Sequence, residues 1–287
     1  MTITLRRGGR ELARELVGPL DAWTEQAPLT ANLHSGDVGW HLRLADPGLD
    51  DAFLLWERDG EPVAAGLAED MVLRTAVAPA HDRSAELAEA LADVMMEFGY
   101  VDALGGSAVR RLLLDRGWSV DPDPWVLLYR ELGPDDARHT DPGTRPVEGE
   151  SDVVARTAVQ RSAFAPGSTF QPELWHRMAD GPTYDRRFDQ VAWAPEGGEA
   201  AAAATGWFAG VGRCAILEPV GTHAAHRQAG YGRRVSLAVM GALARAGASA
   251  VRVQTPAANA GAVKAYESCG LRHVDWTTAL VRPGELG

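Results

Sequence analysis

Amphipathic helical segments alternate with short apolar segments along the whole chain. In the second half, apolar residues at helical spacing predict helices at residues 152–164, 172–179, 231–245 and 259–268. Apolar runs bounded by turn formers predict strands at 188–194, 200–208, 213–220, 250–254 and 273–281. The predicted order is therefore helices, a hairpin turning at 195–198, and then strand, helix, strand, helix and strand.

The first half repeats this order without obvious sequence identity. Helices are predicted at 10–23, 85–98 and 107–115, and strands at 52–57, 63–69, 71–77, 100–103 and 125–132. The segment between the halves, 133–142, is polar and rich in turn formers, which is typical of a linker. The sequence thus predicts an α/β fold with mixed sheets in two domains, 1–132 and 143–287, related by an internal duplication.

Composition excludes some classes of protein. The chain has 287 residues, enough for two hydrophobic cores, and none of its apolar runs approaches the roughly 20 residues that span a bilayer. Its N-terminus mixes charges with apolar residues and does not resemble a secretory signal. The two cysteines, Cys214 and Cys269, have no paired spacing, so we expect buried thiols rather than a disulfide or metal site. These features favour a cytoplasmic protein with no membrane partner.

The net charge of −11 is carried by the first half. Residues 1–134 hold 12 Arg and 23 acidic residues, a balance of −11, whereas residues 139–287 hold 15 basic and 14 acidic residues, a balance of +1. The acidic half should repel nucleic acid and attract a cationic amine, and the nearly neutral half could accept a polyanionic cofactor. An acidic solubilising surface is the alternative explanation.

A glycine-containing loop precedes the helix predicted at 231–245. Glycines in such a loop let the backbone turn tightly so that its N–H groups point outward, and the helix dipole adds partial positive charge. A pyrophosphate would bind well there. The loop sequence is Arg227, Gln228, Ala229, Gly230, Tyr231 and Gly232.

The surroundings of this loop matter more than the loop pattern alone. A strand at 214–222 leads into it, and downstream Asn259 begins a helix that carries Tyr266 near its end, before Gly270. This arrangement resembles the GNAT superfamily of acyl-CoA-dependent N-acyltransferases. The resemblance implies a catalytic domain at 143–287 and a degenerate GNAT-like copy at 1–132, a tandem architecture similar to that of mycothiol synthase.

The resemblance also implies roles in binding acetyl-CoA. The backbone of Val220, Gly221 and Thr222 would bind the pantetheine arm, and the Val220 N–H would polarise the thioester carbonyl. Asn259 would contact the pantetheine or adenosine side. The pyrophosphate would be cradled by Arg227, Gln228, Ala229, Gly230, Tyr231, Gly232 and Arg233. The corresponding loop of the first half, 80–85, has neither glycine and is not expected to bind CoA in this way.

Amine acylation needs a base for the amine and an acid for the departing thiolate. The family resemblance assigns these roles to Glu218 and Tyr266, with His223 acting through water as a rival base. The alternatives are a structural carboxylate, a core tyrosine and a solvated loop histidine. His223 and His226 have no nearby third ligand, so no metal is expected. Trp175, Trp193 and Trp207 either wall the acceptor cleft or pack in the core.

The predicted function is transfer of an acetyl group from acetyl-CoA to a primary amine of a small molecule, without a covalent enzyme intermediate. A non-catalytic acyl-CoA-binding or sensing protein is one alternative, and a peptide or protein N-acetyltransferase is another. The acceptor's identity stays open, as does the oligomeric state, for which a homodimer is one option.

Overall fold

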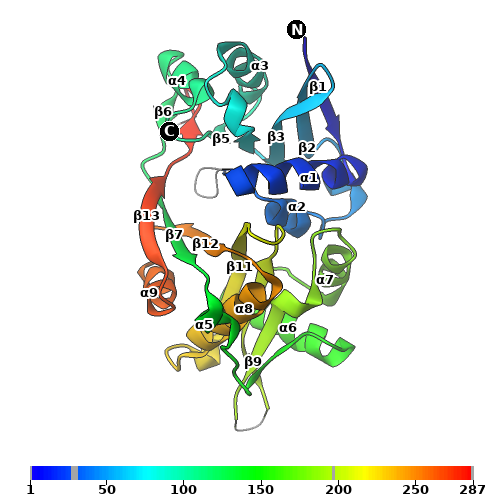
Figure 1. Ribbon diagram of the computed structural model, residues 1–287, viewed down its shortest axis with the longest axis vertical. Helices are drawn as coiled ribbons and strands as arrows, with labels where there is room; N and C mark the ends of the chain where they lie inside the picture. The colour runs from blue at the N-terminus through cyan, green and yellow to red at the C-terminus, as the bar shows by residue number, and fades with distance from the viewer. Residues whose placement is uncertain (1, 27–31, 196–197, 286–287) are drawn as a thin grey trace.

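Two mixed sheets of seven strands each lie one above the other (Figure 1). The structure is a computed structural model that describes residues 2–26, 32–195 and 198–285. Within these residues no helix combines the length and the apolar character that crossing a membrane requires. Both cysteines are buried and free, as predicted.

The first sheet is built mainly by the first half and is covered on both faces. Helices α1 (Arg10–Gln26) and α2 (Ser35–His41) share one apolar cluster with the sheet, and α3 (Ala85–Met95) and α4 (Ala108–Asp115) share another. Burying both faces explains why its central strands are almost continuously apolar. Its order is β1 (Ile3–Gly8), β2 (Phe53–Arg58), β3 (Glu61–Glu69), β4 (Val72–Val77), β5 (Tyr100–Asp102), β14 (Leu280–Val281) and β6 (Ser119–Val120).

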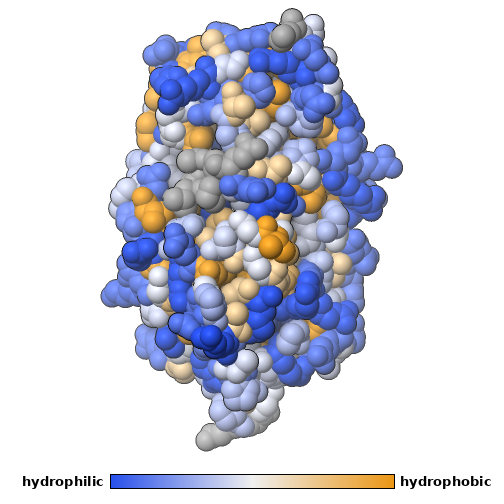
Figure 2. Space-filling view, viewed as in Figure 1, coloured by the Kyte–Doolittle hydropathy of each residue, from blue (hydrophilic) through white to orange (hydrophobic). Residues whose placement is uncertain are grey.

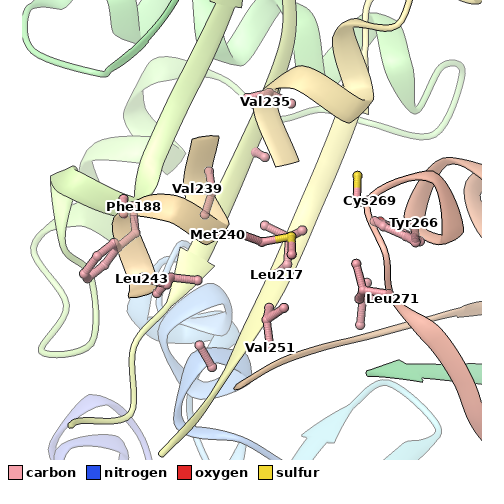
Figure 3. Close-up of a cluster of buried hydrophobic side chains, with 14 of the residues drawn as sticks. Phe188, Leu217, Val235, Val239, Met240, Leu243, Val251, Tyr266, Cys269 and Leu271 are labelled. Atoms are coloured by element: carbon pink, nitrogen blue, oxygen red, sulfur yellow. The ribbon is translucent and has the colours of Figure 1, made fainter. Parts of the chain in front are cut away.

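The second sheet is covered in the same manner. Helices α6 (Glu150–Ala163) and α7 (Pro172–Ala179) pack on one face, and α8 (Tyr231–Ala246) and α9 (Ala260–Ser268) pack on the other. Figure 3 shows the second of these clusters, in which side chains of α8 meet those of the sheet. Its order is β8 (Thr144–Pro146), β9 (Asp189–Trp193), β10 (Ala200–Trp207), β11 (Cys214–Thr222), β12 (Ala250–Pro256), β7 (Trp125–Glu131) and β13 (Arg272–Thr277).

The two halves exchange a strand. The segment 125–132 was expected to complete the first sheet, but β7 lies in the second, between β12 and β13. The predicted last strand, 273–281, is in fact two strands: β13 stays in the second sheet, and β14 pairs with β5 and β6 of the first. Periodicity shows that a strand is buried in a sheet but not which sheet accepts it. Both crossings run along the left side of Figure 1.

The sheet orders support the predicted duplication. Starting from β1 in one sheet and β8 in the other, the strands correspond one to one, with β14 and β7 in equivalent positions. In each sheet, the strand next to the last therefore comes from the other half of the chain: β14 in the first sheet and β7 in the second. The boundary at 133–142 stays a prediction, and four strand pairings cross it. Residues of this segment form α5 (Pro134–Ala137) and pack on α8.

Helix α2, which the sequence did not predict, joins the two halves (Figure 1). A Cβ atom added at Gly36 would lie 2.5 Å from Trp207 Cβ, and one at Gly39 would lie 2.6 Å from Trp207 Cζ3. Only glycine permits so close an approach to β10. His34, buried just before the helix, lies with Nε2 3.1 Å from the Cys214 carbonyl oxygen. Burial lowers the pKa of His34 to about 3, so a neutral imidazole joins the halves here.

Four other short elements were also missed: helix α5 and strands β1, β6 and β8. The three strands lie at sheet edges and are short or carry polar residues, so their patterns are weak. The remaining predicted elements are present, with ends shifted by a few residues. Part of the predicted turn at 195–198 lies outside the described residues.

Candidate functional site

The loop before α8 has the backbone conformation that its glycines predicted. Gly230 has φ +82° and Gln228 has φ +62°, both in the left-handed region. Gly230 is the N-cap of α8 and offers no side chain to the helix. The first N–H groups of this 16-residue helix are therefore left for a ligand, at the positive end of its dipole.

A cavity of about 720 Å³ opens beside this loop. It is lined by 10 of the 11 residues predicted to bind the cofactor, all except Ala229, and by Tyr266. Its charged lining consists of Arg227, Arg233 and Lys264, and no carboxylate of the described chain lines it. Figure 2 shows pale and orange surface over β11 and α8, bordered by hydrophilic surface. This combination suits a ligand with an anionic part and an apolar arm.

The inner wall of the cavity is formed by diverging strands. The parallel pairing of β11 with β12 covers only residues 214–216 of β11, although that strand continues to Thr222. The later residues Val220, Gly221 and Thr222 line the cavity. A Cβ atom at Gly221 would lie 2.7 Å from the Ala163 side chain, so the backbone itself forms the wall at this point. The divergence thus leaves part of β11 open to a ligand, as the family resemblance implied.

Helix α9 contributes Asn259 and Tyr266. The Asn259 side chain caps the helix by accepting a hydrogen bond from the Ala262 N–H at 3.1 Å. Tyr266 is only 8% exposed yet lines the cavity. Burial, followed by the negative charge of Glu218 and then Cys269, raises the pKa of the Tyr266 hydroxyl. The hydroxyl is therefore protonated at neutral pH, as an acid must be before it acts.

Glu218 lies on the other side of the diverging strand, in an irregularity of β11. The register between β10 and β11 shifts between two cross-strand pairs, Gly206–Leu217 and Ala204–Val220. Two β11 residues, Glu218 and Pro219, therefore lie opposite a single β10 residue. The Trp207 indole N–H donates to the Glu218 carbonyl oxygen at 2.6 Å and fixes this bulge. Bulges redirect side chains and are frequent beside active sites.

The charge of Glu218 is controlled by the first half. Burial raises the pKa of its carboxyl group to about 7, with a further contribution from Asp37 that Arg74 opposes. Weaker effects come from Glu69 and Arg43. All four neighbours belong to residues 1–132, more than 140 positions away, so no local pattern along the chain indicates them.

Glu218 lines two cavities between the halves, and neither is the 720 Å³ cavity. One, of about 90 Å³, is also lined by carboxylates of the first half, and the other, of about 320 Å³, is lined by Trp40, Phe164 and Phe170 together with polar residues. Phe164 lines both the 320 Å³ cavity and the 720 Å³ cavity. The proposed base and acid thus face neighbouring cavities that meet at this residue.

Lys264 was not predicted as a site residue. It follows Asn259 by five positions on α9 and lines the same cavity. Phe164 ends α6 and is 46% exposed, an unusual position for a large apolar side chain. Exposure of this kind is not visible in a sequence.

Other candidate residues have structural partners. Trp175 and Trp207 are almost fully buried, and Trp193 packs against the same cluster. His226 Nε2 lies 3.1 Å from a Glu199 carboxylate oxygen. His223 lines none of the cavities described here, and the described residues contain no group of three side chains suited to a metal.

A buried ionic network lies beneath β10. The Arg156 Nε donates to Asp189 at 3.1 Å, and the Trp175 indole N–H donates to the same carboxylate at 2.8 Å. Thr205 and Tyr184 donate to it as well, at 3.0 and 3.2 Å. Arg156 and Asp189 are 1% and 0% exposed, so this network supports the sheet rather than a ligand.

The corresponding helix of the first half has a different N-terminus. Ser84 caps α3 by accepting a hydrogen bond from the Leu87 N–H at 3.3 Å, and Arg58 donates to the same hydroxyl at 3.2 Å. A side chain of the protein itself therefore caps this helix, whereas α8 has no side-chain cap.

Comparison with known proteins identifies the second half. Residues 160–271, from the end of α6 to just beyond α9, match the model of the acetyltransferase (GNAT) family. The second half contains a GNAT domain. The match to this family supports a role in acyl transfer in general. Members of the family act on small-molecule or protein substrates. Among curated proteins, none matches the chain.

Solved structures show that the fold of the whole chain is a tandem GNAT fold. It is similar to a GCN5-related N-acetyltransferase from Sphaerobacter thermophilus, with 20% identity, TM-score 0.58 and coverage of 98% of this chain and 95% of the other. It is also similar to a tandem GNAT protein from the clavulanic acid biosynthesis pathway, with 13% identity, TM-score 0.59 and coverage of 98% of each chain. An acetyltransferase of the GNAT family from Colwellia psychrerythraea has 15% identity and TM-score 0.60, with coverage of 98% of this chain and 99% of the other.

Proposed function

We propose that this protein transfers an acetyl group from acetyl-CoA directly to a primary amine of a small molecule. One observation carries the proposal: the 720 Å³ cavity joins a cationic, glycine-containing loop to a buried tyrosine. We also keep the sequence-based expectation of a cytoplasmic protein.

The residues of the cavity fit CoA. The N–H groups at the start of α8, with Arg227 and Arg233, would hold the pyrophosphate. The open segment of β11, Val220 to Thr222, would hold the pantetheine arm, and Asn259 and Lys264 would border it on the α9 side. Both arginines are already directed by hydrogen bonds to backbone carbonyls, Arg227 to Ala163 at 3.1 Å and Arg233 to Ser268 at 3.0 Å.

Bound acetyl-CoA would supply a thioester whose carbonyl carbon forms a bond to the amine nitrogen while its bond to sulfur breaks. The amine arrives as an ammonium and loses two protons: Glu218 takes one before the attack, a task that suits a carboxylate with a pKa of about 7, and the other leaves to solvent as the amide forms. The Tyr266 hydroxyl gives its proton to the departing sulfur. The protein thus moves two protons and holds the reactants in place.

Isothermal titration with acetyl-CoA tests the cofactor site. We expect one site per chain, lost in Gly230→Glu because a carboxylate would enter the anion site. Gly106→Glu is the matched control, since Gly106 also has a positive φ, +80°, and open space around it. Binding that persists in Gly230→Glu would contradict the proposed loop, and two sites per chain would contradict the expectation that the first half binds no CoA.

A thiol-release assay distinguishes the alternative functions. Release of CoA with small amines supports the proposal. Binding of acetyl-CoA without release in the presence of amines or peptides would indicate the sensing protein. Release only with peptides that have a free N-terminus would indicate a peptide N-acetyltransferase.

A further inference from the structure

The 320 Å³ cavity between the halves has an aromatic wall supplied by both. Trp40 and Arg43 come from the end of α2 and the residues after it, and Phe164 and Phe170 come from the segment between α6 and α7. The Trp40 and Phe170 rings lie 5.1 Å apart between centroids, tilted by 37°. The Arg43 guanidinium lies over the Trp40 ring at 4.3 Å and fixes it from one side.

This cavity borders the proposed reaction centre on two sides. Glu218 and Pro219 of β11 line it, and the next three residues of the same strand line the cofactor cavity. Phe164 separates the two cavities and lines both. A molecule in the aromatic cavity therefore lies beside Glu218, the proposed base. Phe164 separates it from the cavity in which the thioester is proposed to bind.

Size and charge distinguish this cavity from the acidic one behind Glu218. The acidic cavity measures about 90 Å³, room for a few water molecules, whereas 320 Å³ is the size of a small-ligand site. Of the described residues, Glu218 is the one carboxylate that lines the aromatic cavity, and Arg43 is the one cation. Such a lining favours a ligand that has an apolar body and a single ammonium group, which would lie at Glu218. It does not favour a polyamine with several positive charges.

We infer that the acceptor is a primary amine with a planar apolar body, which packs against Trp40 and Phe170 and places its nitrogen at Glu218. This inference rests on the proposed function and gives the first half a part in it: α2 supplies specificity. The degenerate half has lost its cofactor loop but forms one wall of the acceptor site.

The test uses the full-length protein with acetyl-CoA and three amines: 2-phenylethylamine, propylamine and spermidine. We expect kcat/KM to be highest for 2-phenylethylamine. In Trp40→Ala the ratio of kcat/KM for 2-phenylethylamine over propylamine should fall about threefold to tenfold, the usual range for one aromatic contact. Trp40→Phe should keep most of the ratio. Trp276→Ala, which removes a 54% exposed indole on β13, is the matched control and should leave the ratio unchanged.

A ratio that stays the same in Trp40→Ala would overturn the inference, and so would a preference for spermidine. Titration of 2-phenylethylamine into protein saturated with CoA gives a second readout that does not depend on turnover. Absence of binding there would also overturn the inference. Failure of the proposed function is distinguishable from all of these, because then acetyl-CoA itself would not bind or no amine would release thiol.

Discussion

The pH dependence of the reaction should report the ionisation of Glu218. With its pKa raised from 4.5 to about 7, this carboxyl group is mostly protonated at pH 6 and mostly ionised at pH 8. The ionised fraction rises from about one in eleven to about ten in eleven, so kcat/KM for the amine should rise about tenfold over this range. The site is proposed to bind the ammonium form, which predominates throughout this range for an amine with a pKa near 10, so ionisation of the free amine adds little to the change in kcat/KM. An unshifted glutamate would give a level profile.

The assay is thiol release at limiting amine between pH 5.5 and 8.5, with acetyl-CoA affinity measured at each pH. Glu218→Gln should lower kcat/KM by about 10²- to 10⁴-fold, the usual contribution of a general base, and remove the rise. Asp37→Asn keeps the capping geometry of α2 but removes a charge that raises the pKa of Glu218, so the rise should move to lower pH. A level profile in the unmodified protein, or a rise that survives in Glu218→Gln, would refute the role of this carboxylate.

Three further predictions concern other parts of the structure. Tyr266→Phe should lower kcat while changing the Kd of acetyl-CoA little, since only the proton donor is lost; stopped-time assays and calorimetry measure the two effects. Arg156→Met should lower the free energy of unfolding in urea by about 3–5 kcal/mol, because it leaves the Asp189 carboxylate buried and unpaired. Gly36→Ala should cost about 1–3 kcal/mol through overpacking against β10, whereas Gly105→Ala, in open space, should change stability by less than about 0.5 kcal/mol.

Controls separate these effects from general damage. Arg6→Met removes an exposed ion pair with Glu15, whose side chains are 45% and 47% exposed, and should leave stability nearly unchanged because solvent screens the pair. An equal loss in Arg6→Met and Arg156→Met would contradict the argument from burial. Unchanged turnover in Tyr266→Phe would remove its role as the acid.

Local patterns in the sequence were sufficient to predict the cofactor side of the site. The loop at Gly230, the strand before it and the helix from Asn259 to Tyr266 are adjacent along the chain, and each has a local signal of glycine, alternation or capping. The structure places them around one cavity. Their roles in binding CoA stay predictions until the titration is made.

The acceptor side could not be predicted, for a physical reason. Trp40 lies on α2, a seven-residue helix with two glycines, whose formation depends on packing against β10 rather than on its own propensity. Asp37 and Arg74 influence Glu218 only because that packing brings them close. Contacts between residues so far apart in sequence leave no periodic signal. An acidic solubilising surface was therefore as good an explanation of the first half's charge as a role in the site.

The exchange of β7 and β14 makes the two halves inseparable as folding units. A fragment comprising residues 143–287 would lack β7, the strand between β12 and β13, and would expose two sheet edges in the middle of its own core. Expressing the second half alone should therefore give an aggregating or unfolded chain, although it contains all the residues predicted to bind the cofactor. A single cut in the segment 133–142 of the folded protein should leave both pieces associated, because each still holds a strand in the other's sheet. Any evolutionary loss of the degenerate half would consequently require a new strand to fill that position first.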